Sequence, residues 1–137
     1  MRYFNNFYAY YTPSGRWELL ALADVGLQAY QAALTPASVW FTSNAIARYK
    51  LAPEWALAGR VELYSDERGV IFASRAPDTE RFTAYGGSLN LDYSPAAHLR
   101  LRLEHRLLAS PSNSFTDRRG NATGLNHFII ASLSARF

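Results

Sequence analysis

Charged side chains stand at every second position in several stretches of this 137-residue chain. The clearest stretch is residues 98–108, where leucines alternate with Arg100, Arg102, Glu104 and Arg106. A period of two puts these charges on one face of a β-strand and the leucines on the other. Such a face could line a water-filled passage. The passage would then favour anions, because rings of Arg and Lys do so. It could equally be a solvated wall whose charges pair across strands and contribute little each.

Extending the alternation over the whole chain gives a charge count for this polar face. Eight cations fall on it (Arg2, Arg48, Lys50, Arg60, Arg100, Arg102, Arg106 and Arg136) against five acids (Glu18, Asp24, Glu62, Asp92 and Glu104). The excess of three cations predicts a weakly anion-favouring lining. The predicted lining residues are Arg48, Lys50, Arg60, Glu62, Arg100, Arg102, Glu104, Arg106 and Arg136.

The remaining reactive side chains do not form an enzymatic arrangement. His98, His105 and His127 are too scattered for a ligand cluster, and no HExxH spacing occurs. His105 directly follows Glu104, so on a strand the two side chains point to opposite faces. The chain has no cysteine, which excludes disulfides and thiolate metal sites. We therefore expect no catalysis, no cofactor and no metal.

Two glycine-containing motifs have structural interpretations. Gly86-Gly87 is followed by no helix and so is no phosphate loop; it more plausibly relieves crowding at a bend or faces a large cross-strand aromatic residue. The Asp66-Glu67-Arg68-Gly69 stretch is predicted to be a solvated loop, because a calcium site needs more oxygen ligands at fixed spacing.

Seven alternating segments supply the elements that position these residues. They cover residues 2–11, 16–30, 39–51, 55–64, 82–93, 98–108 and 125–137. Segments of about 10–15 residues match or exceed the roughly 9–11 that a tilted strand needs to cross the hydrocarbon of a membrane, whereas ordinary strands run to about 5–6.

The connections between segments differ systematically. Pro13, Pro53 and Pro95 lie in short turns, whereas residues 65–81 and 109–124 form long polar connections. Short turns at one rim and long loops at the other are typical of transmembrane β-barrels. Aromatic residues flank the apolar face at the short-turn end, as in an interfacial girdle: Trp17, Tyr49, Trp55 and Tyr93.

These features predict an all-β fold: an antiparallel up-and-down transmembrane β-barrel of about seven strands. Residues 1–137 would be a single barrel domain or the C-terminal fragment of a larger one. The alternative is a soluble β-sandwich or small barrel, with the apolar faces turned inward. Because seven strands leave the first and last parallel, we expect no complete ladder between them and at least one further strand upstream.

The stretch from Trp40 to Asp66, with Arg48-Tyr49, Pro53, Trp55, Arg60-Val61-Glu62 and Asp66 in order, resembles the OmpL-like outer-membrane β-barrel porins. The resemblance extends from Trp40 to the terminal Phe137 and corresponds to the C-terminal part of that family. It implies a place in the outer membrane of a Gram-negative bacterium and passive passage of small hydrophilic solutes or ions, with no catalytic residues to carry over.

Several expectations follow for partners and alternatives. Outer-membrane lipid would contact the apolar face, small hydrophilic solutes the polar face, and barrel-assembly machinery the C-terminal strand ending in Phe137; no nucleic-acid partner is expected. A non-conducting structural or ligand-binding small barrel remains the competing function, and an outer-membrane enzyme is the less favoured one. We expect Leu103→Arg to be costly and Arg102→Leu to cost little.

Overall fold

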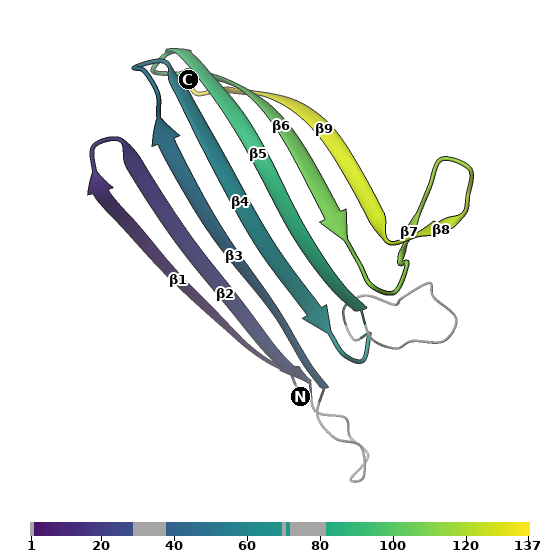
Figure 1. Cartoon of the computed structure of the whole chain (residues 1–137). Helices are drawn as coiled ribbons and strands as arrows, with labels where there is room; N and C mark the ends of the chain where they lie inside the picture. The colour runs from purple at the N-terminus through teal and green to yellow at the C-terminus, as the bar shows by residue number, and fades with distance from the viewer. Residues whose placement is uncertain (1, 29–37, 70, 72–81) are drawn as a thin grey trace.

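The computed structural model describes residues 2–28, 38–69, 71 and 82–137. Their main feature is one seven-stranded antiparallel sheet in the order β1-β2-β3-β4-β5-β6-β9 (Figure 1). Its strands are β1 (Arg2–Ser14), β2 (Trp17–Gln28), β3 (Ser38–Lys50), β4 (Trp55–Asp66), β5 (Phe82–Ala96), β6 (Leu99–Ala109) and β9 (Leu125–Ala135). Each strand of this sheet pairs with the next long strand along the chain, β6 with β9, which confirms the predicted up-and-down topology.

A small hairpin departs from the prediction. The polar connection after β6, expected to lack strands, contains β7 (Phe115–Thr116) and β8 (Ala122–Thr123), which pair with each other. Two residue pairs are too short to give a period-two signal, so their pairing depends on the turn between them. Within the described part of the chain there is no helix that could cross a bilayer.

Prolines at the strand ends lie in irregular ladders rather than in the turns themselves. β1 continues through Pro13 to Ser14 and β5 through Pro95 to Ala96, and in both cases the register shifts after the last regular pair. Proline has no N–H to give to a ladder, which confines it to bulges and edges. The sequence placed these residues in turns, and the structure moves the turns one or two residues further on.

The register assigns every strand residue to one of two faces. Even-numbered residues such as Arg48, Ala58, Asn90 and Glu104 stand opposite one another across four strands. We call this the polar face. The odd-numbered residues form the apolar face, and they supply most of the exposed large hydrophobic side chains of the sheet.

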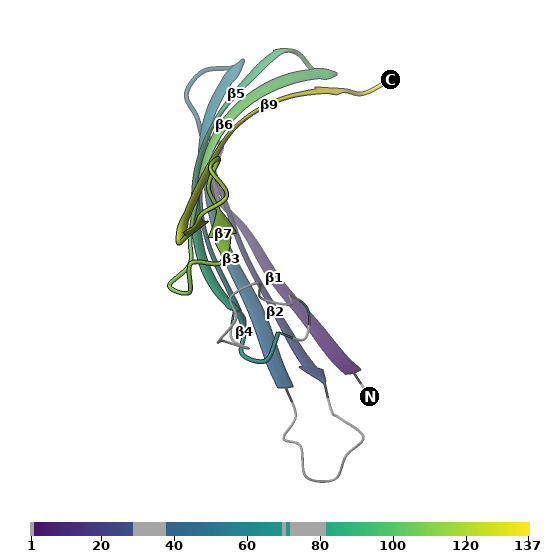
Figure 2. The ribbon, with the colours of Figure 1, turned by 90° about the vertical axis from the view of Figure 1, so that its right-hand side faces the viewer.

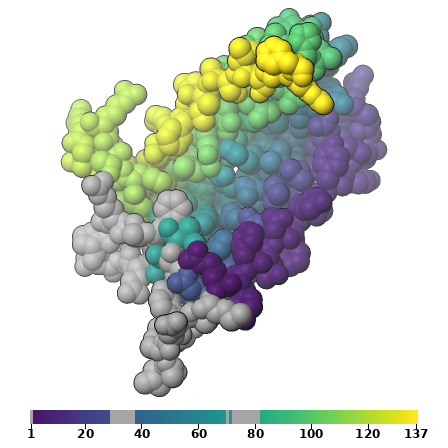
Figure 3. Space-filling view, turned by 180° about the vertical axis from the view of Figure 1, so that it is seen from behind, coloured from purple at the N-terminus to yellow at the C-terminus, as the bar shows by residue number. Residues whose placement is uncertain are grey.

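The sheet is strongly bent (Figure 2). Viewed from behind, it is hollowed, with the N-terminal and C-terminal residues on opposite sides of the hollow (Figure 3). The polar face lies on the inside of the bend, because its side chains reach each other across an intervening strand: Arg60 on β4 contacts Glu104 on β6. The buried strand residues Ala56, Ala58, Asp92, Asp66 and Ser38 all belong to this face.

The two rims of the sheet differ as predicted. At one, which we call the short-turn rim, β1, β3 and β5 connect to the next strand by a few residues, and Figure 1 shows the C-terminus there. At the other, the long-loop rim, the connections after β2, β4 and β6 are longer, and the N-terminus lies there. The expected connection 65–81 and the expected end of the second segment at residue 30 lie largely outside the described residues.

The sheet is open. β1 pairs only with β2 and β9 only with β6, and no ladder joins β1 to β9 among the described strands. The two edge strands run in the same direction, as an odd number of reversing strands requires. The prediction that the first and seventh strands lack a common ladder is therefore confirmed.

Candidate pore lining

The structure places the predicted lining residues together on the polar face. Eight of the nine occupy even positions of β3, β4 and β6, which the ladders with β5 and β9 align on one face: Arg48, Lys50, Arg60, Glu62, Arg100, Arg102, Glu104 and Arg106. The ninth, Arg136, follows β9, and its backbone N–H donates to the carbonyl of His98 at 2.9 Å. This bond continues the β6–β9 alignment, in which Arg100 stands opposite Ser134.

A buried carboxylate organises the charges near the short-turn rim. The Asp92 side chain is 1% exposed. Arg102 on the neighbouring strand binds its carboxylate through two hydrogen bonds, from Nε to Oδ1 at 2.7 Å and from Nη2 to Oδ2 at 3.0 Å. Arg48 approaches the same carboxylate at 3.5 Å from the other side. Arg102 thus holds the carboxylate with a fork of two hydrogen bonds, which fixes geometry as well as charge, while Arg48 adds a second positive charge nearby.

Small residues make this cluster possible. Arg48 lies on β3 and Asp92 on β5, so the pair spans β4, where Ala56 and Ala58 stand in register beneath it. Both alanines are buried, at 3% and 5% exposure. A larger side chain at either position would occupy the space through which the Arg48 guanidinium passes. On its other side, Arg48 donates to Glu18 of β2 at 3.0 Å.

A second cluster spans β5 at mid-strand. Arg60 contacts Glu104 at 2.9 Å, and Arg106 contacts Glu62 at 2.6 Å. Both pairs join β4 to β6 over the small residues of β5. A Cβ placed on Gly86 would overlap the Glu62 side chain. Of the two roles predicted for Gly86-Gly87, Gly86 therefore relieves crowding, by leaving room for a carboxylate, and does not face a cross-strand aromatic residue.

The aromatic–glycine contact occurs elsewhere. Gly26 on β2 stands opposite Trp40 on β3, and the indole ring lies where a Cβ of Gly26 would be. Phe4 of β1 stacks on the same indole, with ring centroids 5.5 Å apart. These residues lie on the polar face near the long-loop rim, so this part of the polar face carries aromatic packing as well as charge.

β4 adds one acid that the sequence analysis missed. The predicted strand ended at Tyr64, but β4 continues to Asp66, which stands opposite Trp40 on the polar face. Asp66 is fully buried and accepts a hydrogen bond from the N–H of Ile71 at 2.8 Å. The count on the polar face becomes eight cations against six acids, so the cationic excess is two rather than three.

The apolar face carries aromatic pairs at the short-turn rim. Trp17 packs on Tyr49 with ring centroids 4.8 Å apart, and Trp55 on Tyr93 at 4.5 Å. Each pair joins adjacent strands at the same height as the turns. The structure confirms that these four residues share one face and one rim, as a girdle at a membrane interface requires.

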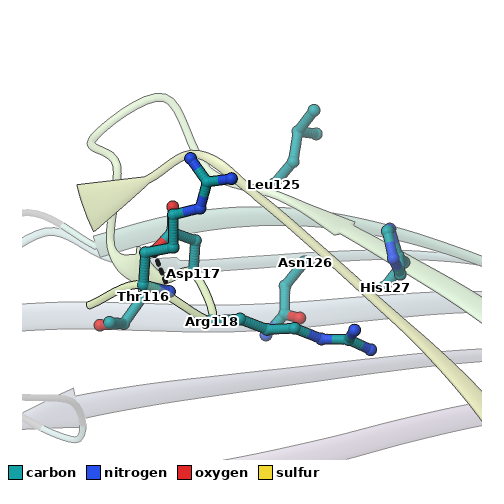
Figure 4. A pocket seen from close by; sticks show the side chains of 7 residues that line it. Thr116, Asp117, Arg118, Leu125, Asn126 and His127 are labelled. Atoms are coloured by element: carbon teal, nitrogen blue, oxygen red, sulfur yellow. Dashed lines mark hydrogen bonds between the residues drawn. The ribbon is translucent and has the colours of Figure 1, made fainter. Parts of the chain in front are cut away.

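A hollow of about 510 Å³ lies where the β7–β8 hairpin meets the start of β9 (Figure 4). Figure 4 shows the Arg118 side chain beside Asn126. The Asp117 carboxylate at this site is hydrogen-bonded within its own turn: it accepts hydrogen bonds from the backbone N–H groups of Asn121 and Arg119, both at 2.8 Å. Hydrogen bonds from Asn121 in particular hold the pKa of Asp117 below its ordinary value.

Two of the three histidines lie away from the charged side chains of the polar face. His105 and His127 lie on the apolar face, opposite Ile129 and Leu107 of the neighbouring strands. As predicted, His105 and Glu104 point to different faces. In the part of the chain that the structure describes, no three His, Cys, Asp or Glu side chains come together as metal ligands.

A bent antiparallel sheet of long strands, with a charged inner face, an apolar outer face and an aromatic rim, defines a wall of a porin-type β-barrel. The chain belongs to the family described as "Putative beta-barrel porin-2, OmpL-like", whose model matches residues 1–137. The match includes the first two strands, which the resemblance noted above did not cover. No curated protein and no solved structure matches the chain.

Proposed function

We propose that this chain forms part of the wall of a channel in the bacterial outer membrane, through which small hydrophilic solutes and ions diffuse passively. The polar face would line the aqueous lumen and the apolar face would contact lipid. The proposal assigns the chain no catalytic step and no cofactor.

The observation that carries this proposal is the opposite character of the two faces in the middle of the sheet. On β6, Leu103 is 54% exposed on the apolar face, while Arg102 on the polar face is bound to a buried carboxylate. On the central strands β4 and β5, Val61 and Leu89 of the apolar face are 64% and 57% exposed. A soluble barrel would bury these apolar side chains and expose the charges, so the arrangement fits a protein whose outer solvent is lipid.

The open edges bear on how the wall closes. Among the described strands, β1 and β9 each pair with a neighbouring strand on one side only, and lipid does not tolerate an open sheet edge. We propose that further strands pair with both edges, because a lumen wide enough for water needs more than seven strands. The strand that ends near Phe137 would be the one presented to the barrel-assembly machinery.

Selectivity in this channel would be weak. The excess of cations on the polar face is small, and Arg48, Lys50, Arg60, Arg102 and Arg106 each lie within 4.0 Å of a carboxylate. Paired charges cancel much of each other's field, so the lining would favour anions slightly rather than exclude cations.

Conductance tests the proposal directly. The assembled protein, extracted from outer membranes and inserted into planar lipid bilayers, should give stepwise ohmic currents with a reversal potential displaced modestly toward that of chloride in a potassium chloride gradient. A properly folded, lipid-inserted protein that carries no current would support the non-conducting barrel instead.

We propose that the long-loop rim faces the outside of the cell and the short-turn rim faces the periplasm. This orientation can be tested because the chain contains no cysteine, so one introduced thiol is unique. Arg118→Cys lies at the long-loop rim, and on whole cells it should react with a membrane-impermeant thiol reagent. Ala97→Cys at the short-turn rim is the matched control and should react only after the outer membrane is ruptured. The reverse pattern would invert the proposed orientation.

A further inference from the structure

The cationic excess on the polar face is not spread evenly along the strands. Near the short-turn rim, five cations face two carboxylates: Arg48, Lys50, Arg100, Arg102 and Arg136 against Glu18 and Asp92. At mid-strand, Arg60 and Arg106 are matched one-to-one by Glu104 and Glu62. The positive charge of the lining is therefore concentrated at one mouth.

Both carboxylates at this mouth already have two cationic partners each. Glu18 is shared by Arg48 and Lys50, at 3.0 and 3.3 Å. Asp92 receives two hydrogen bonds from Arg102 and lies 3.5 Å from Arg48. Among the described residues, neither Arg100 nor Arg136 has a carboxylate within 4.0 Å. Arg100 interacts with Asp92 at longer range only, so neither guanidinium group forms a close ion pair with a carboxylate of the described residues.

Both belong to one small hollow. A cavity of about 250 Å³ at the short-turn rim is lined by Arg100 and Arg136 together with the hydroxyl-bearing Ser94 and Ser134 and with His98. Arg100 and Ser134 are cross-strand partners, and the backbone bond from Arg136 to His98 closes the end of the same ladder. The lining offers donors on three strands, β5, β6 and β9, and on one turn, and it contains no carboxylate.

We propose that this hollow binds an anion of the phosphate class at the short-turn mouth. The inference rests on the proposed channel function and deepens it by naming a site and a ligand chemistry. A guanidinium presents a planar fork of donors that matches two oxygens of an oxyanion, and two guanidinium groups with two hydroxyls can engage all four oxygens of a tetrahedral ion. Chloride is a single sphere and does not present two oxygens to match this fork.

A charged mouth next to a balanced middle also makes the channel electrically asymmetric. Anions entering from the short-turn side meet the excess positive charge first, whereas anions entering from the long-loop side first meet paired charges. Phosphate bound at the mouth would lie in the path of other anions. Phosphate should therefore reduce chloride current more when it is added on the short-turn side.

Equilibrium binding tests the site without depending on conduction. Inorganic phosphate is titrated calorimetrically into the full protein in detergent at constant ionic strength. The paired change Arg100→Gln and Arg136→Gln should raise the Kd about tenfold or more, because it removes two charge-assisted contacts. Arg2→Gln is the matched control: Arg2 lies at the long-loop rim and donates to Gln28 at 2.5 and 3.0 Å, so its loss should leave the Kd unchanged.

A second pair of variants covers the case in which the glutamine pair fails to fold, as judged by its β-sheet circular dichroism. Arg100→Lys with Arg136→Lys keeps both charges but removes the forks, and it should also bind phosphate more weakly than the natural protein. Unchanged binding in every folded variant, or equal weakening by Arg2→Gln, would overturn the site. Adding phosphatidic acid to the detergent separates two sources of the same group: competition with free phosphate would identify a lipid headgroup as the occupant.

Conduction and binding can fail separately. If the protein binds phosphate through these arginines but carries no current, the site stands and the channel proposal falls. If it conducts but binds phosphate no better than the glutamine pair does, the channel stands and the site falls. Equal phosphate block from both sides of the bilayer would likewise refute a site at one mouth.

Discussion

Replacing Arg102 by leucine should destabilise the protein substantially, although Arg102 lies on a face exposed to water in the proposed channel. Alternation alone treats Arg102 as one of several exchangeable polar side chains. The geometry shows that it supplies two hydrogen bonds, at 2.7 and 3.0 Å, to an Asp92 carboxylate that is 1% exposed. Arg102→Leu would leave this carboxylate buried with only Arg48 at 3.5 Å.

The magnitude follows from the partners that remain. Removing one member of a buried ion pair costs about 3–5 kcal/mol when the other charge is left uncompensated. Here Arg48 compensates partly, and the Arg102 side chain is itself 34% exposed, which lowers the estimate to about 2–3 kcal/mol. Arg100→Leu is the matched control on the same strand and face, and it should cost less than about 1 kcal/mol, since it breaks no close ion pair among the described residues.

Urea unfolding in lipid vesicles, followed by the fluorescence of Trp17, Trp40 and Trp55, would measure both free energies. The double variant Asp92→Asn/Arg102→Leu completes the cycle and should recover part of the loss, because it removes the stranded charge. Equal destabilisation by Arg102→Leu and Arg100→Leu, or a coupling energy near zero, would refute the view that Asp92 organises this cluster.

Three further predictions concern other parts of the molecule. Leu103→Arg on the apolar face should lower the free energy of unfolding in vesicles by about 2–4 kcal/mol, and a change near zero would mean that this face does not meet lipid. Gly26→Ala should destabilise by about 1–3 kcal/mol because its Cβ overlaps an indole, whereas Gly59→Ala, which meets open space, should be nearly neutral; equal effects would contradict the contact. The pKa of Asp117 is lowered in the folded turn, so the ionised carboxylate stabilises the turn fully above the ordinary pKa of 3.8. This stabilisation is lost as the pH falls through the lower pKa of the folded state. The amide chemical shifts of the β7–β8 turn should therefore change in that acidic range and not between pH 6 and 8.

The alternation of side chains by itself determined the strands, the two faces and the difference between the rims. The two faces of a strand can be identified from the sequence alone, because successive side chains point to opposite faces with a period of two. Arg100, Arg102, Glu104 and Arg106 could therefore be assigned to one face before their neighbours were known. The same counting predicted that seven reversing strands leave the first and last without a common ladder.

Strand ends and short hairpins were less predictable. β4 continues to Asp66 because its ladder with β3 does, and that partner is not visible in local sequence. Pro13 and Pro95 predict turns by their residue type, yet each lies at the end of a strand where the register shifts. Local turn signals do not distinguish a turn from a bulge just before it, since both exclude a regular ladder bond.

Only the tertiary structure decided which charges meet. Alternation places Arg48, Asp92, Arg60 and Glu104 on one face, but it does not show that the pairs form across an intervening strand. That depends on the bend of the sheet, which brings next-nearest strands together on the inner face, and on small residues such as Ala58 that leave the path open. The sequence could count the charges of the lining; the curvature determined which of them cancel and left Arg100 and Arg136 without a carboxylate partner among the described residues.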